Sequence, residues 1–226
     1  MATSVVFFAA LRCTLLEGYQ MKILETIDLP LKGAKLINYA RFADERGYFS
    51  EIYRKSDFQD LAARLGLESF DFQQANESRS KKNVVRGLHF QYRPPQGKLI
   101  RLLYGQAVDM ALDVRVESPS FGKAIMVEMK CDLSYGQWIW LPAGLAHGNF
   151  YLSDSAIEYF CTASYSPDGE LGISPTDPDL DFSLCSEALV GSYKRVLRND
   201  LILSERDRQG MTLDSWRSDP RAKSVK

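Results

Sequence analysis

Apolar and polar residues alternate through most of the middle of the chain, which is typical of strands that present two different faces. In segment 106–115 the apolar positions are Val108, Met110, Leu112 and Val114, and between them lie Ala107, Asp109, Ala111, Asp113 and Arg115. Alternation also puts Ile157, Tyr159, Cys161, Ala163 and Tyr165 on one face, and shorter runs cover 99–104, 123–129 and 137–141. Turn residues separate the runs: Gly97, Gly105, Gly122, Gly136, Pro142 and Gly144. The pattern predicts an all-β antiparallel jelly roll with a few peripheral helices, although an immunoglobulin-like sandwich has the same strand period.

Helical periodicity is confined to two segments outside these runs. Ser56 is expected to begin the first helix, because Gln59 three residues later can complete a capping box. The apolar stripe of this helix and the glycine that ends it are Phe58, Leu61, Leu65 and Gly66. The second helix is expected to begin near Ser204, with Asp207 three residues later.

The length of 226 residues fits one domain with a sizeable core. The apolar run 5–11 has no positive charge before it and is too short to span a bilayer, so it predicts neither a secretory signal nor a membrane span. We expect residues 1–20 to be a loosely ordered extension, 21–210 to form the domain, and 211–226 to be a mobile tail. A formal net charge of −1 argues against non-specific binding to nucleic acid or to an anionic membrane.

The four cysteines, Cys13, Cys131, Cys161 and Cys185, are widely spaced and include no C-x-x-C pair. This spacing predicts free thiols in a reducing compartment, the cytoplasm, rather than a disulfide framework or a zinc site.

The sequence contains only two histidines, and both lie in segments that suggest a site. His89 shares one strand face with Gly87, whereas His147 lies in a turn that enters another strand. A lone histidine is more often structural, but Lys98, Asp109 and Tyr159 lie on strands that could converge with both. Alternation points Asp109 and Asp113 inward, where carboxylates without partners are costly, so the interior is expected to be a polar cavity rather than a filled core.

Six blocks of sequence resemble the dTDP-4-dehydrorhamnose 3,5-epimerase family and occur in the same order: 44–49, 74–76, 86–91, 97–99, 108–115 and 142–148. The resemblance covers about residues 21–210. It implies a cupin-type jelly-roll subunit, a homodimer, and a substrate cavity inside the barrel. The implied substrate is a nucleotide-linked 4-keto-6-deoxyhexose, and the implied reaction inverts C3 and C5 beside the keto group.

The resemblance also implies catalytic roles. His89 corresponds to the general base, and Asp207 corresponds to the aspartate that orients this base. Tyr159 corresponds to the general acid on the opposite side of the sugar, with Tyr165 on the same strand face as the alternative. Lys98 corresponds to the lysine that holds the developing enolate. Asp207 is also a suitable carboxylate for a helix N-terminus, and Lys98 could be a solvated charge at a strand end.

The same resemblance assigns a second set of residues to substrate binding. The polar wall of the pocket and the contacts around the nucleotide correspond to Arg46, Glu51, Gln74, Asn76, Arg86, Asp109, His147 and Tyr165. Arg46 could instead close a local ion pair with the carboxylates just before it.

These residue types suit the chemistry. A proton beside a ketone becomes removable only when the resulting oxyanion is stabilised, and one positioned donor contributes about 3–4 kcal/mol. Histidine titrates near neutral pH and can take the proton, while an aspartate fixes its tautomer. Inversion then needs a proton from the other face, which a tyrosine can deliver. Arginines suit the diphosphate because a guanidinium binds it through two donors.

The chain departs from the family in segment 172–179, where serine and prolines replace a tryptophan-containing block, and at Phe182, which replaces a second tryptophan. These departures leave open the nucleotide and whether one carbon or both are inverted. The alternatives are a single-carbon epimerase, a sugar 3,4-ketoisomerase, a non-catalytic sugar-nucleotide-binding protein and a metal-dependent cupin. The last is disfavoured because the sequence has no H-x-H pair, so we predict no metal and no cofactor.

Overall fold

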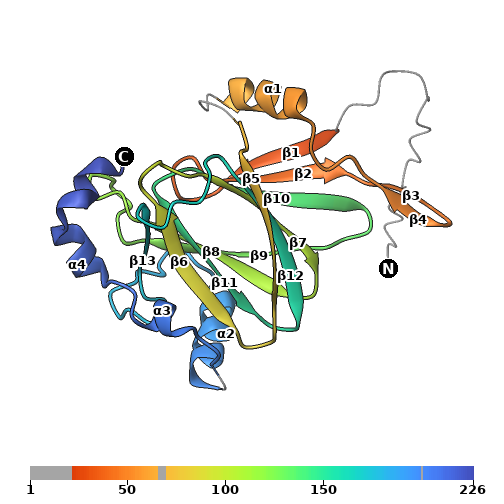
Figure 1. The fold of residues 1–226 in the computed structure, drawn as a ribbon. Coiled ribbons are helices and arrows are strands. Elements are labelled where there is room, and N and C mark those ends of the chain that lie inside the picture. Colours follow the sequence, from red (N-terminus) through yellow and green to blue (C-terminus); the bar gives the residue numbers. More distant parts are fainter. Residues whose placement is uncertain (1–21, 66–69, 200) are drawn as a thin grey trace, which may run out of the picture.

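The computed structural model describes residues 22–65, 70–199 and 201–226, and it is built around two antiparallel sheets (Figure 1). The first sheet has the strand order β1 (Ile23–Asp28), β2 (Lys35–Ala40), β10 (Tyr135–Leu141), β7 (Lys98–Tyr104), β12 (Ser155–Cys161) and β5 (Gln74–Ser80). The second has the order β13 (Glu170–Gly172), β6 (Val85–Gln91), β11 (Leu145–Tyr151), β8 (Ala107–Asp113) and β9 (Ala124–Glu128). A separate hairpin, β3 (Phe42–Asp44) with β4 (Gly47–Phe49), projects from the body. The predicted all-β jelly roll with peripheral helices is confirmed.

The alternation in β8 divides its side chains between two apolar layers. Val108, Met110 and Leu112 join a core cluster with helices on the outer face of the second sheet. Ala107 and Ala111 join the cluster that fills part of the space between the two sheets. A third cluster lies on the outer face of the first sheet. Because helices cover both outer faces, strands such as β8 are buried on both sides.

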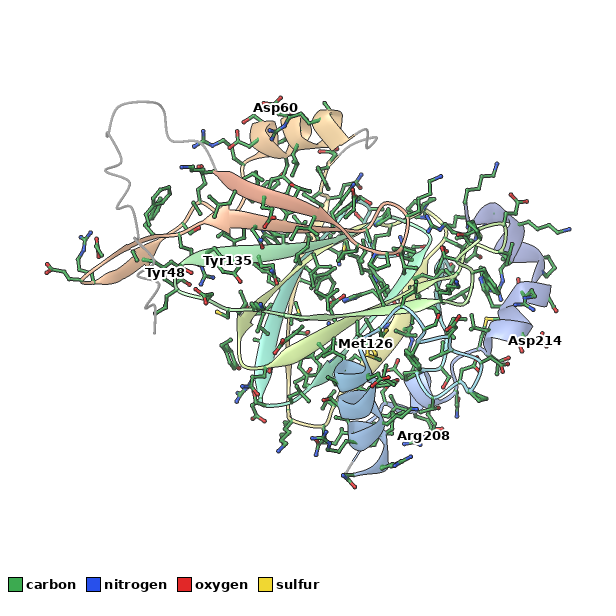
Figure 2. The ribbon with its side chains drawn as sticks, turned by 180° about the vertical axis from the view of Figure 1, so that it is seen from behind. Tyr48, Asp60, Met126, Tyr135, Arg208 and Asp214 are labelled. Atoms are coloured by element: carbon green, nitrogen blue, oxygen red, sulfur yellow. The ribbon has the colours of Figure 1, made fainter. Side chains whose placement is uncertain are left out.

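Helix α1 (Lys55–Leu65) packs Phe58 and Leu61 into this third cluster, as predicted, and turns Asp60 outward (Figure 2). It begins before Ser56, so the predicted capping box is wrong, and the Ser56 hydroxyl donates to Asp57 Oδ1 at 3.2 Å instead. The side chain of Leu65 and residue Gly66 lie outside the described residues, as do residues 1–20.

Helix α3 (Glu205–Arg208) begins where predicted, because the Ser204 hydroxyl accepts the N–H of Asp207 at 3.1 Å. Helix α2 (Glu187–Arg198) was not predicted. It starts at the cap residue Ser186 and buries Tyr193 and Val196 against the second sheet.

The C-terminal segment differs from the predicted mobile tail. It forms α4 (Leu213–Ser218) and a 3-10 helix, η1 (Pro220–Ser224). Trp216 is fully buried, stacks edge-on against Phe90, and donates its indole N–H to Val114 O at 2.7 Å. Ala222 and Val225 are buried in the same core, so apolar packing continues beyond residue 210. Within the described residues, no helix has the length and apolarity needed to cross a membrane.

Candidate active site

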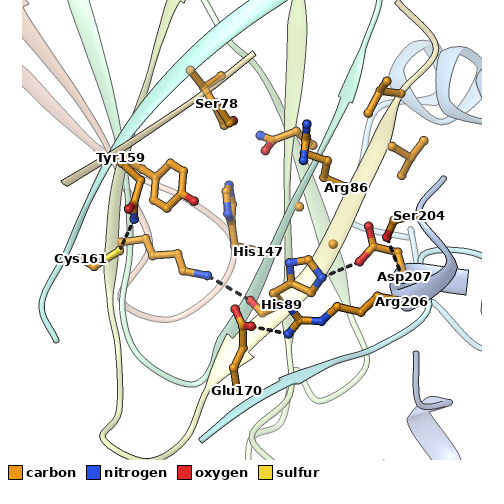
Figure 3. A pocket seen from close by; sticks show the side chains of 18 of the residues that line it. Ser78, Arg86, His89, His147, Tyr159, Cys161, Glu170, Ser204, Arg206 and Asp207 are labelled. Atoms are coloured by element: carbon orange, nitrogen blue, oxygen red, sulfur yellow. Dashed lines mark hydrogen bonds and ion pairs between the residues drawn. The ribbon is translucent and has the colours of Figure 1, made fainter. Parts of the chain in front are cut away.

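A cavity of about 720 Å³ lies between the two sheets and is closed on one side by the segment around α3. Side chains from both sheets reach it (Figure 3). The cavity brings together these residues from the sequence prediction: Gln74, Asn76, Arg86, His89, Lys98, His147, Tyr159, Tyr165 and Asp207. Asp109 lies directly behind its wall, hydrogen-bonded to His147.

His89 and Asp207 form a hydrogen-bonded pair on the wall made by the second sheet. His89 Nε2 lies 2.6 Å from Asp207 Oδ1, and the aspartate side chain is only 5% exposed. Burial by itself would raise the pKa of Asp207, but the hydrogen bond and charge of His89, with the Ser204 and Gly87 hydrogen bonds, lower it overall. Assigning the Nε2 proton to this bond leaves the lone pair on Nδ1, which makes the ring a suitable base.

Lys98 is buried rather than solvated at a strand end. Its side chain is 8% exposed, and Nζ donates to the backbone carbonyl of His89 at 3.3 Å. Burial lowers the pKa of Lys98, whereas Cys161, Glu170 and Asp109 oppose this effect. The lysine therefore places a hydrogen-bond donor next to the histidine, in surroundings that shift the pKa of its ammonium group.

Tyr159 faces the cavity from β12, on the sheet opposite His89. Its ring centroid lies 6.3 Å from that of His147. Burial raises the pKa of Tyr159, so the phenol stays protonated and can act as an acid. Tyr165 lines the same cavity beyond the end of β12, but its side chain is 49% exposed. This difference in burial favours Tyr159 over Tyr165 as the acid.

The two inward carboxylates of β8 have different partners. Asp109 Oδ2 accepts from His147 Nε2 at 2.7 Å and from Asn149 Nδ2 at 2.8 Å, which compensates its burial beside the cavity. Asp113 instead bonds Arg115 at 2.8 Å and the Ser118 and Ser120 hydroxyls at 2.6 Å. Asp113 therefore orders a loop, and it does not line the cavity as its strand position suggested.

Two glycines bring the strands of the two histidines close together. A Cβ on Gly87, whose φ is +105°, would lie 2.6 Å from the His147 carbonyl oxygen. A Cβ on Gly148 would lie 2.5 Å from the Arg86 carbonyl oxygen. The pairing of β6 with β11 shifts register here, which orients His89 and Arg86 into the cavity.

We expect Gly148→Ala to lower the free energy of unfolding by about 1–3 kcal/mol, because the added methyl group would overlap backbone. Gly191→Ala in α2 is the matched control, since a Cβ there meets nothing within 4 Å. The control should stabilise the helix by about 0.5–1 kcal/mol. Denaturant unfolding at a fixed protein concentration measures both values, and equal effects at the two sites would contradict the strand contact.

Arg46 and Glu51 are not in the cavity. Arg46 lies on the β3–β4 hairpin, where its backbone N–H donates to Asp44 Oδ1 at 2.9 Å and its side chain pairs with the same aspartate. This is the local ion pair considered as the alternative. Glu51 pairs with Arg54 at 2.7 Å. Within one chain, neither Arg46 nor Glu51 contacts the cavity.

Several cavity residues were not predicted, notably Ser78, Gln96, Glu170 and Arg206. The position of Arg206 beside Asp207 was the one signal that could have revealed it. The departures from the family lie elsewhere: Ser174 bonds Thr176, and Phe182 packs on Tyr193. Neither lines the cavity. Among residues 22–65, 70–199 and 201–226, no group of three or more His, Cys, Asp or Glu is placed to hold a metal ion.

Comparison with known proteins decides the family. A family model described as dTDP-4-dehydrorhamnose 3,5-epimerase matches residues 28–215. The chain belongs to this epimerase family. The epimerase of that name from Methanothermobacter thermautotrophicus is 39% identical over 183 residues, which cover 80% of this chain and 90% of the relative. The predicted family and enzyme class, an isomerase, are therefore confirmed.

Solved structures support the assignment of the chain to this family. The dTDP-6-deoxy-D-glucose-3,5-epimerase of Legionella pneumophila, in complex with dTDP-4-keto-L-rhamnose, superposes with a TM-score of 0.72 at 33% identity. That match covers 89% of this chain and 96% of the other. A 3'-monoepimerase from Streptomyces bikiniensis, in complex with dTDP-quinovose, gives a TM-score of 0.68 at 28% identity and covers 83% and 88% of the two chains.

Proposed function

We propose that the protein inverts C3 and C5 of a dTDP-linked 4-keto-6-deoxyhexose, converting dTDP-4-dehydro-6-deoxyglucose to dTDP-4-dehydrorhamnose. The observation that carries the proposal is the arrangement of one cavity. The His89–Asp207 pair lies on one sheet and Tyr159 on the other. A base and an acid on opposite faces of a sugar are what inversion requires. The names of the relatives support the substrate class.

The steps follow from these positions. His89 Nδ1 takes the proton from the carbon beside the ketone, and the Asp207 carboxylate stabilises the resulting imidazolium. The electron pair of the broken C–H bond forms a C=C bond to the carbonyl carbon, and the π pair of the carbonyl moves to its oxygen, where the Lys98 ammonium stabilises the enolate. The Tyr159 hydroxyl then gives a proton to the opposite face of the same carbon. Proton exchange with water restores the imidazole and the phenol, so the reaction has no net redox change.

The decisive experiment is incubation of the pure protein with dTDP-4-dehydro-6-deoxyglucose in heavy water. NMR should show deuterium entering at C3 and at C5, with inversion at both carbons. Deuterium at C3 alone would support a single-carbon epimerase, a possibility favoured by the likeness to the 3'-monoepimerase. A keto group that moves to C3 would indicate a ketoisomerase. Binding without any exchange would contradict catalysis altogether.

Chelation tests the predicted independence from metals. Prolonged dialysis against a chelator should leave turnover unchanged, since His89, Lys98 and Tyr159 supply the base, the charge and the acid themselves. Loss of activity that a divalent ion restores would overturn the mechanism as a whole.

The proposal includes a homodimer. The β3–β4 hairpin leaves three aromatic rings exposed, Phe42 at 46%, Tyr48 at 46% and Phe49 at 63%, which is unusual for a surface that stays in water. Tyr48 lies on this hairpin, which projects beyond the end of the first sheet near Tyr135 (Figure 2). A second copy covering the hairpin would bury these rings. It would also bring Arg46 and Glu51 toward the other cavity, where they could contact the nucleotide.

Light scattering should therefore give a mass of two chains, and Phe49→Asp should weaken the dimer and the binding of dTDP together. Leu184→Asp, at another partly exposed apolar residue, serves as the control and should leave the mass unchanged. A monomeric wild-type protein with full activity would exclude this arrangement. Cytoplasmic location belongs to the proposal too, and the free thiols of Cys131, Cys161 and Cys185 support a reducing compartment.

A further inference from the structure

Asn149 is a buried polar residue of the cavity wall that has no role in the mechanism described above. It lies on β11, lines the cavity, and is only 2% exposed. Its amide nitrogen Nδ2 donates to Asp109 Oδ2 at 2.8 Å, and this oxygen also lies 2.7 Å from His147 Nε2. A carboxylate can only accept hydrogen bonds, so Asp109 fixes the amide with its nitrogen toward β8. The carbonyl oxygen of the amide, Oδ1, is therefore directed away from Asp109.

The chemistry of this carbonyl oxygen determines what it can bind. Within the part of the chain that the structure describes, the bond from Nδ2 to Asp109 is the one hydrogen bond that the Asn149 side chain makes. Oδ1 is thus an acceptor at a cavity wall without a donor from the protein. The oxygens of a diphosphate are acceptors too and cannot bond it. The group that suits Oδ1 is a hydroxyl, which can donate.

The pairing of β11 with β6 indicates which hydroxyl lies beside Asn149. His147 is paired with His89, the base of the proposed reaction, whereas Asn149 is paired with Arg86, whose guanidinium reaches the same cavity (Figure 3). Two residues along a strand span about 7 Å, so one sugar ring can contact both levels of the wall. A guanidinium suits a diphosphate, so the level of Arg86 and Asn149 is the diphosphate side of the ring.

The structure of the sugar then leaves one choice. A 4-keto-6-deoxyhexose joined to a diphosphate at C1 has its ring hydroxyls on C2 and C3. C3 is a reacting carbon and lies at the level of His89. C2 lies between C3 and the carbon that carries the diphosphate. The hydroxyl at the level of Asn149 is therefore the one on C2.

We propose that Asn149 is a specificity-determining residue: its carbonyl oxygen accepts a hydrogen bond from the C2 hydroxyl, so that the protein selects 2-hydroxy over 2-deoxy sugar nucleotides. This inference rests on the proposed function for its ligand class. Asp109 holds the amide in one orientation, and turning it to offer a donor instead would break the bond from Nδ2. A 2-deoxy sugar leaves the buried carbonyl oxygen unpaired, which lowers its affinity.

Two ligands that differ by one oxygen atom test the selection. dTDP-glucose and dTDP-2-deoxyglucose lack the keto group, so calorimetry measures their dissociation constants without turnover. Wild-type protein should bind the 2-deoxy sugar about 10-fold more weakly, the effect of leaving a buried acceptor unpaired. Asn149→Leu, which keeps a similar volume, should make the two constants equal by weakening dTDP-glucose alone. dTDP, which has no sugar, should bind equally to wild type and variant.

Ser78→Ala is the matched control, since Ser78 is another uncharged polar residue that lines the cavity, on β5. It should keep the ratio between the two glucose nucleotides, and loss of the ratio in this variant would assign the C2 hydroxyl to Ser78. A residue that only braces Asp109 and His147 predicts that Asn149→Leu weakens both ligands equally, and this result would overturn the proposal. Equal binding of the two ligands by wild-type protein would overturn it without any variant. Asn149→Ala replaces Asn149→Leu if the leucine variant does not fold.

Failure of this inference can be separated from failure of the proposed function. If wild-type protein epimerises the keto sugar but binds the two glucose nucleotides equally, only the role of Asn149 is wrong. If it shows no epimerisation but keeps a ratio that Asn149→Leu removes, the selection is supported and the proposed reaction is wrong. Binding of neither glucose nucleotide would overturn both.

Discussion

His89→Ala is expected to slow solvent-deuterium exchange at the sugar ring by about 10²–10⁴-fold, the range for loss of a positioned base. The reason is geometric. Asp207 holds Nε2 at 2.6 Å and directs the other ring nitrogen to the substrate, and no second histidine can take this place because His147 is engaged by Asp109. NMR in heavy water measures the rate directly.

Binding of dTDP by the His89→Ala variant is the control for correct folding. The His89 side chain is 26% exposed, so its removal should leave the core intact and the dissociation constant of dTDP within a few-fold of wild type. Asp207→Asn should give a smaller loss, because the base remains but its orientation and the stabilisation of the imidazolium weaken. Exchange at close to the native rate in His89→Ala would show that another group removes the proton.

Tyr159→Phe should separate removal of the proton from its return. The substitution keeps the ring that packs beside the apolar layer between the sheets, so the fold should be undisturbed. His89 can still remove the proton, and deuterium should therefore enter in the original configuration. Formation of inverted product should fall by ~100-fold or more, because the acid on the opposite face is absent.

Tyr165→Phe is the matched control for this experiment. Its ring lies beyond the end of β12 and is 49% exposed, so loss of its hydroxyl should affect inversion much less. If Tyr159→Phe forms product normally while Tyr165→Phe does not, the acid is Tyr165 and the assignment from burial is mistaken.

Much of the barrel could be predicted from local pattern. Alternation in segment 106–115 predicted β8 and the division of its side chains between two layers, because a strand has a period of two residues. Helical and terminal segments were less predictable. α2 and the packed C-terminal segment have weak local signals, and burial of Tyr193 and Trp216 against the second sheet stabilises them. A few large apolar residues hold these segments against the sheet, and so few residues produce no clear periodic pattern in the sequence.

The candidate site was likewise predictable only in part. The sequence by itself determined which residue types were present: two histidines, a lysine after a glycine, and a tyrosine on an alternating strand. Alternation also determined which face each occupied. It could not determine neighbours, because these depend on how distant strands pair. Asp109 and Asp113 look alike in the sequence, yet one bonds His147 and the other orders a loop.

The tertiary structure brings Asp207 to His89 across 118 residues, a pairing that strand and helix patterns could not specify and that only the family resemblance implied. It also decides between the two interpretations of Arg46, which lies outside the cavity of its own chain. It likewise joined Glu170 to Arg206 at the cavity opening. The physical reason is that a hydrogen bond or ion pair depends on distance and direction to within a fraction of an ångström. Sequence spacing specifies such geometry within one helix or strand, whereas the packing of the two sheets and of α3 specifies it between them.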